Sequence, residues 1–525
     1  MKNVMFFRQH HFICLLFLNF VFVLLVTQSF YWHYESNDDL IMAWIASGKF
    51  LGSPDRHLVF INVVYGIVLS WLYKLLPFVE WYTLLLLTFH VLSLTIIAKW
   101  LLKQEIMKVI KLAIFVLLYL LEVRMLLSLQ FTTTSGLLST AALVLIIETR
   151  KKNLILGILL FVLASMIRFQ AAMLVGLVFC MFYPLFVYYF EFSFPQFLAL
   201  ITCVLLSISF SMIDKKNYQS DPEWGYYYEY NKVRGRLNDN PNSWRAFDHL
   251  PQNVCKEDYK MLTWYFFPDP SVLDLNTMRI LYDTVEKQTG YKSVPYIKKT
   301  KNIWYSMKGY VSYFSLLVSI CLIFVFAMED RTGRILCSFG FVGFLLIFSW
   351  ISMNMFVKER AFLCAFFAFV VFILSLVERL KYRFSFVLLS WLMIIIGHFT
   401  IRLFADSKLF YKSEMPDEGV VILKEINKTP VILGELVTAS LNPMKLQEGY
   451  MNACASGWTT VMPNKNGIGS YLDLVNEGIP IVISKEYYSD VVETLQTSLR
   501  FHHLIKVDPC VLSETEHYIA FCLKQ

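Results

Sequence analysis

Long apolar segments recur along the first 404 residues of the chain, and most of them run for about 17 to 22 residues. A helix of that length can cross the hydrocarbon core of a membrane, which is about 30 Å thick. The apolar segments of a soluble protein are shorter and are interrupted by polar faces. The pattern therefore predicts an α-helical polytopic membrane protein rather than a soluble one.

About eleven of these segments are predicted to span the membrane. The first follows Lys2 and Arg8 and lacks an A-x-A-like cleavage site, so we expect an uncleaved helix with its N-terminus in the cytoplasm. Most compact clusters of Lys and Arg then fall on the cytoplasmic side, as the positive-inside rule requires. The predicted spans are 12–30, 81–98, 112–129, 131–147, 154–167, 169–189, 197–213, 310–328, 335–356, 361–377 and 384–404.

The segment 58–76, in the first outer loop (31–80), is also apolar enough to span. If it crossed the membrane, the basic stretch 99–111 would lie outside, against the positive-inside rule. Tyr65, Trp71 and Lys74, scattered along 58–76, suit a helix that lies in the interface. We therefore predict that 58–76 is interfacial and that 99–111 is cytoplasmic.

Two further regions lie outside the predicted membrane domain. The large outer loop, 214–305, contains six prolines, which are expected to divide it into short helices and turns. The tail, 405–525, is predicted to form a small α/β extracytoplasmic domain, distinct from the transmembrane domain 1–404. Its expected strands are 420–423, 430–433, 479–483 and 504–507, and its expected helices are 471–476 and 486–499, with Gly478 as a helix stop.

Composition supports the membrane assignment, because 57% of the residues are hydrophobic and a soluble domain has about 45–50%. The net charge of +7 comes from short clusters beside the apolar segments, so it indicates topology and not a nucleic-acid partner. Cys255, Cys454, Cys510 and Cys522 lie in loops without zinc-site spacing. No cofactor is implied and a divalent metal is not supported, although Cys510 and Cys522 could pair in an oxidising compartment.

The first candidate site is Asp38-Asp39, where the chain leaves the membrane after the first span. Ser36 and Asp39 match a capping box, and acids in a first helical turn are favoured by the helix dipole. Two carboxylates near the headgroups also suit a general base, because partial desolvation raises a carboxyl pKa. Both interpretations stay open at this level.

Charged residues inside or beside the spans form the second candidate group. Glu122 and Arg124 lie within one predicted span, where charges are costly, and residues two apart on a helix do not face each other. Arg168 lies between two spans, and Lys358 with Arg360 breaks the positive-inside pattern in a short outer turn. The alternatives are interfacial snorkelling and a phosphate clamp, and the unusual location favours the clamp. His90 and His398, alone in apolar segments, are expected to be hydrogen-bonded core residues.

These features together resemble the GT-C superfamily of polyprenyl-phosphate-sugar-dependent membrane glycosyltransferases. Asn37-Asp38-Asp39 stands where the family carries its catalytic Asp, and the stretch 52–57 looks like the join into a second interfacial helix. Lys358-x-Arg360 looks like the basic motif that binds the lipid phosphate. The resemblance covers about residues 1–400 by architecture and the first outer loop by motif. Many members carry a second acid after the third segment, whereas this chain has a Gln-Phe-Thr-Thr-Thr-Ser stretch at 130–135, which argues against a two-acid or metal-assisted mechanism.

The resemblance implies a cell-envelope enzyme that moves a sugar from a polyprenyl-phosphate donor in the lipid bilayer to an acceptor on the outer face. Asp38 or Asp39 would be the base. The side chains expected to bind substrate are Arg124, Arg168, Lys358, Arg360 and Glu122. Two alternatives are a transporter or flippase for a lipid-linked anionic solute, which would suit Glu122 and Arg124 in the membrane, and a non-catalytic membrane scaffold.

Overall fold

The computed structural model of the chain describes most of its residues. The described residues are 2–148, 151–190, 193–238, 240, 247–265, 267–289, 303–304, 311–354, 357–380, 382–405, 422, 425–426, 431–433, 443–444, 453–455, 457–463 and 469–525. The predicted strand at 420–423 and the basic residue Arg150 lie outside the described residues, except for residue 422 of that strand.

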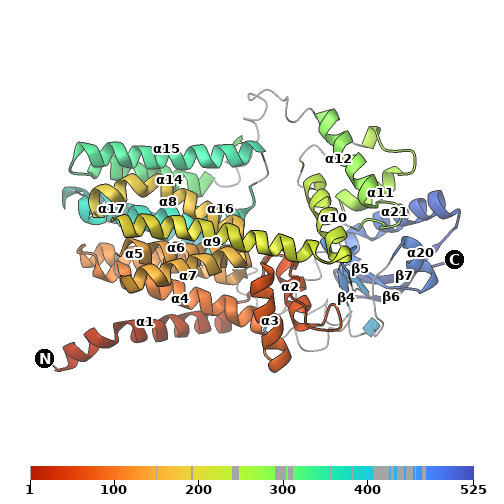
Figure 1. Ribbon diagram of the computed structural model, residues 1–525, viewed down its shortest axis with the longest axis horizontal. Helices are drawn as coiled ribbons and strands as arrows, with labels where there is room; N and C mark the ends of the chain where they lie inside the picture. Colours follow the sequence, from red (N-terminus) through yellow and green to blue (C-terminus); the bar gives the residue numbers. More distant parts are fainter. Residues whose placement is uncertain are drawn as a thin grey trace.

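The apolar segments form a bundle of long, roughly antiparallel helices (Figure 1). Their bounds match the predicted spans closely because the apolar runs end at polar or helix-breaking residues. Five of them are long and apolar enough to cross a membrane: 12–29 of α1, α4, α8, α9 and 331–353 of α15. The bundle helices are α1 (Lys2–Ser29), α4 (Trp81–Lys103), α5 (Lys108–Leu127), α6 (Phe131–Ile147), α7 (Lys151–Ile167), α8 (Phe169–Phe190), α9 (Phe194–Gln219), α14 (Val311–Ala327), α15 (Arg331–Asn354), α16 (Glu359–Leu374) and α17 (Tyr382–Ala405).

The two ends of the bundle differ. At one end, the N-terminus lies with the short turns that follow α4, α6 and α16 (Figure 1). There Lys103 pairs with Glu148, and the backbone N–H of Glu105 donates to Glu378. The large loop and the C-terminal sheet lie at the opposite end. The basic stretch 99–111 is therefore at the end that carries the N-terminus, which agrees with the predicted arrangement of the chain.

Two short helices, α2 (Asn37–Ser47) and α3 (Val63–Leu75), run across the second end of the bundle rather than along it (Figure 1). A helix of 13 residues such as α3 rises about 20 Å, which is less than the thickness of a hydrocarbon core. Its exposed face carries Ile67, Val68 and Trp71, while Tyr65 and Tyr73 are buried against the protein. This one-sided apolar exposure supports the interfacial interpretation of 58–76.

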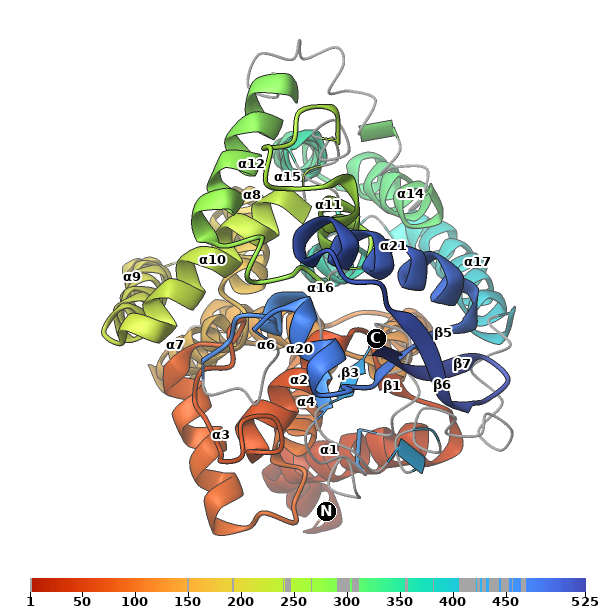
Figure 2. The same cartoon turned by 90° about the vertical axis from the view of Figure 1, so that its right-hand side faces the viewer.

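The large loop and the tail cover the same end of the bundle (Figure 2). The loop forms α10 (Pro222–Asn238), α11 (Lys256–Thr263) and α12 (Leu275–Thr289), as the prolines predicted. The tail contains a five-stranded sheet with the order β4-β3-β5-β7-β6. β3 (Val431–Leu433) pairs in parallel with β4 (Ala453–Ala455) and β5 (Ile481–Ser484), whereas β7 (Tyr518–Lys524) is antiparallel to β5 and to β6 (Asp508–Glu514).

The predicted elements of the tail are mostly confirmed. Helices α20 (Tyr471–Asn476) and α21 (Lys485–His503) and strands β3 and β5 form where expected, and Gly478 has a φ of +60°. The prediction of a strand at 504–507 is wrong, because the chain is extended later, in β6. Leu504 has a positive φ of 57° and turns the chain out of α21 before the strand begins. Cys510 and Cys522 are register partners in β6 and β7.

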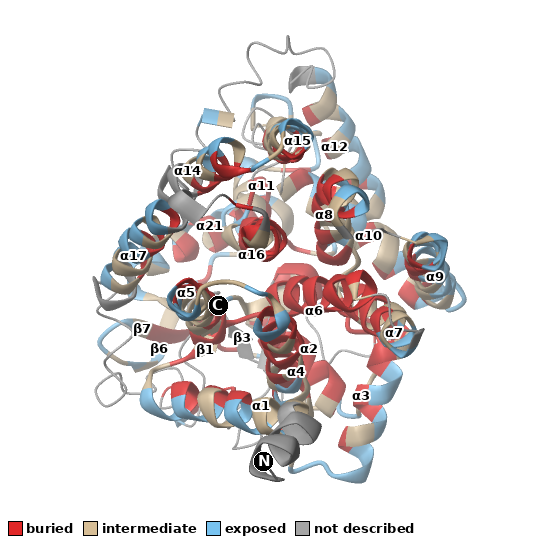
Figure 3. Cartoon of the chain, turned by 90° about the vertical axis from the view of Figure 1, so that its left-hand side faces the viewer, coloured by how far each residue is buried: buried red, intermediate tan, exposed pale blue. Residues whose placement is uncertain are grey.

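Buried apolar residues fill the centre of the bundle, and α6 is buried along its whole length (Figure 3). The same cluster continues into the tail through Trp458, Met462, Val482 and Ala520. Two smaller clusters lie in the outer part, one between α21 and the sheet and one among α10, α11 and α12. The tail is therefore packed on the membrane part and shares its core.

Candidate functional site

The first outer loop is attached to the bundle by a short parallel sheet. β1 (His33–Tyr34) pairs with β2 (Ser128–Leu129), and the N–H of Glu35 donates to the carbonyl of Leu129 at 3.1 Å. Helix α2 begins directly after this contact and ends at Gly48, whose φ is +86°. A Cβ on Gly48 would lie 2.6 Å from the backbone N of Pro54, so only glycine fits this turn. The start of α2 is thereby held against the end of α5.

Asp38 lies at the start of α2 and is reached by groups from two distant parts of the chain. The indole Nε1–H of Trp458 donates to its Oδ1 at 2.9 Å. Nη2 of Arg360 lies 3.6 Å from its Oδ2. The Asp38 side chain is 17% exposed and that of Arg360 is 16% exposed, so neither is completely buried. Asp38 is thus a paired but partly exposed carboxylate.

Asp39 has a different environment, since it is completely buried. Its Oδ1 accepts from the hydroxyl of Tyr82 and from the backbone N–H of Phe131, both at 2.9 Å. Its Oδ2 has no hydrogen-bond partner among the described residues. Burial raises the pKa of Asp39 well above its usual value, although these two hydrogen bonds oppose the shift.

The predicted capping box at the start of α2 is wrong. Ser36 is the N-cap, but its side chain makes no capping hydrogen bond. Asp39 instead caps a different helix, because Phe131 is the first residue of α6. A carboxylate at a helix N-terminus satisfies an N–H that has no partner within the helix. The sequence could not show this contact, because it joins residues that are 92 positions apart.

Arg360 owes its position to close packing between α16 and α6. A Cβ on Gly136 of α6 would lie 2.5 Å from the sulfur of Cys364, so a larger residue there would push the helices apart. The Cys364 thiol in turn donates to the carbonyl of Thr132 at 3.2 Å. Lys358 is the N-cap of α16, and its side chain is exposed with no partner among the described residues. Both cations are therefore at the α2 end of the bundle.

More charged groups lie near Asp38 and Arg360. Arg124 lies 3.3 Å from Glu359 and donates to the hydroxyl of Ser128 at 3.1 Å. Burial lowers the pKa of His33, and the nearby charge of Arg124 adds to that shift. Desolvation by the surrounding protein raises the pKa of Glu35, although part of the residue reaches solvent. The negative charges of Glu359 and Asp38 raise this pKa further, whereas the positive charges of Arg360 and Arg124 lower it.

Arg168 is linked to Asp39 and Trp458 through two aromatic side chains, Phe131 and Phe60. Its guanidinium lies 5.5 Å from the ring centroid of Phe60 and 5.3 Å from that of Phe131. Phe60 also meets Trp458 edge to face, with ring centroids 5.0 Å apart. Phe131 is the residue whose N–H binds Asp39. Aromatic rings and cations therefore surround Asp38 and Asp39.

Glu122 is not part of this cluster. It is fully buried, and its Oε1 lies 2.6 Å from Nδ1 of His90, whose Nε2 lies 2.9 Å from the hydroxyl of Thr134. His90 is thus a hydrogen-bonded core residue, as predicted. The same prediction for His398 is wrong, because His398 is exposed on α17. Glu122 and Arg124 face different partners, as their spacing indicated.

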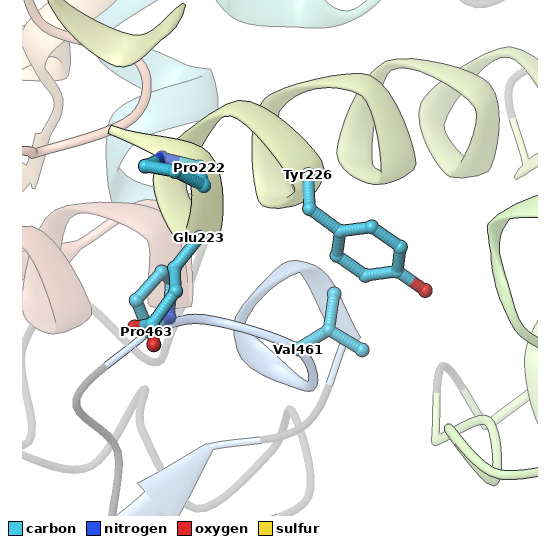
Figure 4. A pocket seen from close by; sticks show the side chains of 5 residues that line it. All are labelled: Pro222, Glu223, Tyr226, Val461 and Pro463. Carbon is cyan, nitrogen blue, oxygen red and sulfur yellow. The ribbon is translucent and has the colours of Figure 1, made fainter. Parts of the chain in front are cut away.

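An open pocket of about 390 Å³ lies beside the contact between the large loop and the tail (Figure 4). It is lined by Pro222, Glu223, Tyr226, Val461 and Pro463. Tyr226 precedes Tyr227, whose hydroxyl donates to the carbonyl of Trp458 at 2.8 Å. The pocket therefore adjoins the segment that brings Trp458 to Asp38.

One group among the described residues has the composition of a metal site, namely Cys255, Asp258 and His502, with ligand atoms within 4.8 Å of one another. Asp258 is already satisfied, because it accepts from the N–H of Cys255, from Ser498 and from His502. The group also lies at the N-terminus of α11, where the helix dipole disfavours a cation. Burial further raises the pKa of the Cys255 thiol, which opposes the thiolate that a metal needs. The arrangement fits a hydrogen-bonded contact between α11 and α21 better than a metal centre.

Comparison with known proteins adds little to this geometry. No family model and no curated protein matches the sequence. Among solved structures, the crystal structure of ArnT from Cupriavidus metallidurans in the apo state is similar at 10% sequence identity, with 97% of each chain covered and a TM-score of 0.43. A likeness at this level does not decide the function.

The sequence singled out seven residues. The structure brings six of them, Asp38, Asp39, Arg124, Arg168, Lys358 and Arg360, to one end of the bundle, whereas Glu122 lies apart beside His90. It also adds residues that the sequence did not indicate. Trp458 and Phe60 are the main additions, together with Glu35 beside the cations. The residues around Trp458 in the sequence, including Gly457 before it, do not indicate this contact.

Proposed function

We propose that this protein is a membrane glycosyltransferase of the GT-C type, which moves a sugar from a polyprenyl-phosphate donor to an acceptor at the outer face of the membrane. The observation that supports this most is the pairing of Asp38 with Arg360 at the bundle end covered by the loop and the tail. A base and a phosphate-binding cation must lie together for this reaction, and they come from opposite parts of the chain.

In the proposed reaction, Asp38 takes the proton of the acceptor hydroxyl. The hydroxyl oxygen then bonds to the anomeric carbon of the sugar while the bond from that carbon to the phosphate oxygen breaks. The electron pair leaves on the polyprenyl phosphate, so negative charge develops there. We propose that Arg360 and Lys358 stabilise that charge. Asp38 is preferred to Asp39 as the base because Asp39 is buried and already caps α6.

Arg168 and Arg124 are proposed to support the same phosphate from further away. Arg168 lies against Phe60 and against Phe131, which is buried. We leave Glu122 out of the site, since His90 holds it inside the bundle. The transporter alternative would need Glu122 to change partners during transport. The observation that favours it is the Oε2 of Glu122, which has no hydrogen-bond partner among the described residues.

If Lys358 and Arg360 form a phosphate clamp, the affinity for the donor should depend on the shape of the cation at position 360. Arg360→Lys keeps the charge but removes the two-pronged guanidinium, so binding of a polyprenyl monophosphate should weaken by about 1–3 kcal/mol. Arg360→Ala and Lys358→Ala should weaken it further. Binding can be measured with purified protein in detergent, and Arg279→Ala, an exposed Arg of α12, is the matched control. Unchanged affinity in both alanine variants at 358 and 360 would exclude the clamp.

The proposed orientation places the tail, 405–525, outside the cell and the α4–α5 turn in the cytoplasm. Single cysteines at Lys108 and Asn476, both exposed, test it. We expect an impermeant maleimide to label intact cells at 476 and to label position 108 only after permeabilisation, with the unsubstituted chain as background. Labelling of position 108 in intact cells would reverse the topology and place the proposed site on the wrong side.

A further inference from the structure

Trp458 is the one tail residue, among those that the structure describes, that donates a hydrogen bond to Asp38. It lies in a short 3-10 helix, η4 (Gly457–Thr459), and is only 6% exposed. The two residues of the contact are 420 positions apart. An indole N–H can donate but cannot accept, so it interacts best with the ionised carboxylate and cannot relay a proton.

Several contacts hold the indole in place. The hydroxyl of Tyr227 donates to the Trp458 carbonyl, and the ring packs edge-on against Phe60. Gly457 has a φ of +80°, which favours glycine and turns the chain toward the bundle. The position of the N–H is therefore set by the large loop, by the first outer loop and by the backbone of the tail, and not by Asp38 alone.

The contact acts on the orientation of the carboxylate. The terminal torsion of an aspartate is soft, so its plane is set by the groups around it. Arg360 faces Oδ2 and Trp458 faces Oδ1, while Glu35, Asp39 and Tyr227 are the other titratable groups near it. Without the indole N–H, the carboxylate is free to rotate and to offer both oxygens to the guanidinium. It would then present fewer lone pairs to an acceptor hydroxyl.

We propose that Trp458 is a positioning residue that fixes the carboxylate of Asp38 for reaction, so that the C-terminal tail completes the site of the transmembrane part. This proposal rests on the proposed function, in which Asp38 is the base. It gives the tail a part in positioning the proposed base.

The contact can be tested without an activity assay. In full-length protein labelled with ¹⁵N-tryptophan, the Trp458 indole signal is identified by its loss in Trp458→Phe. We expect this signal to move in Asp38→Ala, which removes the acceptor oxygen. It should stay close to its wild-type position in Asp38→Asn, whose amide oxygen still accepts, and in Asp39→Asn. A signal that does not respond to Asp38→Ala would overturn the proposal.

The functional arm uses Trp458→Phe, which keeps an aromatic ring beside Phe60 and removes the N–H donor together with part of the indole. We expect kcat to fall about tenfold, as loss of a hydrogen bond to a charged group implies, while the donor KM changes less than twofold. Trp264→Phe, an exposed indole of the large loop, is the matched control and should behave as wild type. A rate in Trp458→Phe equal to wild type, or higher because the indole only covers Asp38, would reject the positioning role.

The two arms separate this proposal from the proposed function. If no preparation of the wild-type protein transfers sugar but the indole signal responds to Asp38→Ala, the contact stands and the glycosyltransferase function fails. If Asp38→Asn abolishes transfer and Trp458→Phe does not slow it, the function stands and the role of Trp458 fails.

Discussion

Replacing Asp38 by Asn is expected to reduce sugar transfer by about 10²–10⁴-fold, which is the usual contribution of a general base. The amide cannot take a proton from the acceptor, but its carbonyl oxygen still accepts from Trp458, so the fold should be retained. Transfer is measured with purified protein in lipid vesicles or by mass spectrometry of surface glycans in cells. Expression level and thermal unfolding should remain close to wild type.

The matched control is Asp39→Asn. Because burial raises the pKa of Asp39 and favours its neutral form, an amide of the same shape replaces it with little change. We expect Asp39→Asn to retain most of the transfer rate, in contrast to Asp38→Asn. If both variants transfer sugar at the wild-type rate, neither acid is catalytic. If only Asp39→Asn is inactive, the base has been assigned to the wrong residue.

Truncation of Asp39 to Ala is expected to be the most destabilising single change at the site. It removes the acceptor of two buried donors, the hydroxyl of Tyr82 and the N–H of Phe131. Each unsatisfied buried donor costs about 1–3 kcal/mol, so the free energy of unfolding should fall by about 2–6 kcal/mol. Thermal unfolding in detergent measures the loss.

The corresponding control at the neighbouring position is Asp38→Ala. Asp38 is partly exposed and the indole of Trp458 is the one buried donor that would lose its acceptor, so the expected loss of stability is smaller than for Asp39→Ala. A melting temperature of Asp39→Ala equal to that of Asp38→Ala would contradict the capping role at α6. The two acids would then have similar surroundings, unlike those that the structure describes.

The apolar periodicity predicted the membrane part well because membrane helices are long and carry a strong signal. The bounds of α6 agree at both ends with the predicted segment, since Gln130 and Glu148 interrupt the apolar run. The charged residues of the site could be selected by type and location, because a cation in an outer turn or an acid at a membrane exit is unusual.

Partners within the site could not be predicted from one sequence. Asp39 matched a local capping pattern, yet its carboxylate reaches a helix that follows 92 residues later. Trp458 lies in a region with no periodic pattern, and nothing in the residues around it indicates Asp38. Such contacts depend on how distant segments meet in space, and local propensity does not contain that information.

The distance along the chain between Asp38 and Trp458 also has a consequence for biogenesis. A ribosome adds about 5–20 residues per second, so the 420 residues that separate them take about 20–80 s to synthesise. During that interval the first loop has already left the translocation machinery without its last partner. Newly inserted chains therefore pass through a stage in which the membrane helices are in place and the contact between Asp38 and Trp458 has not yet formed.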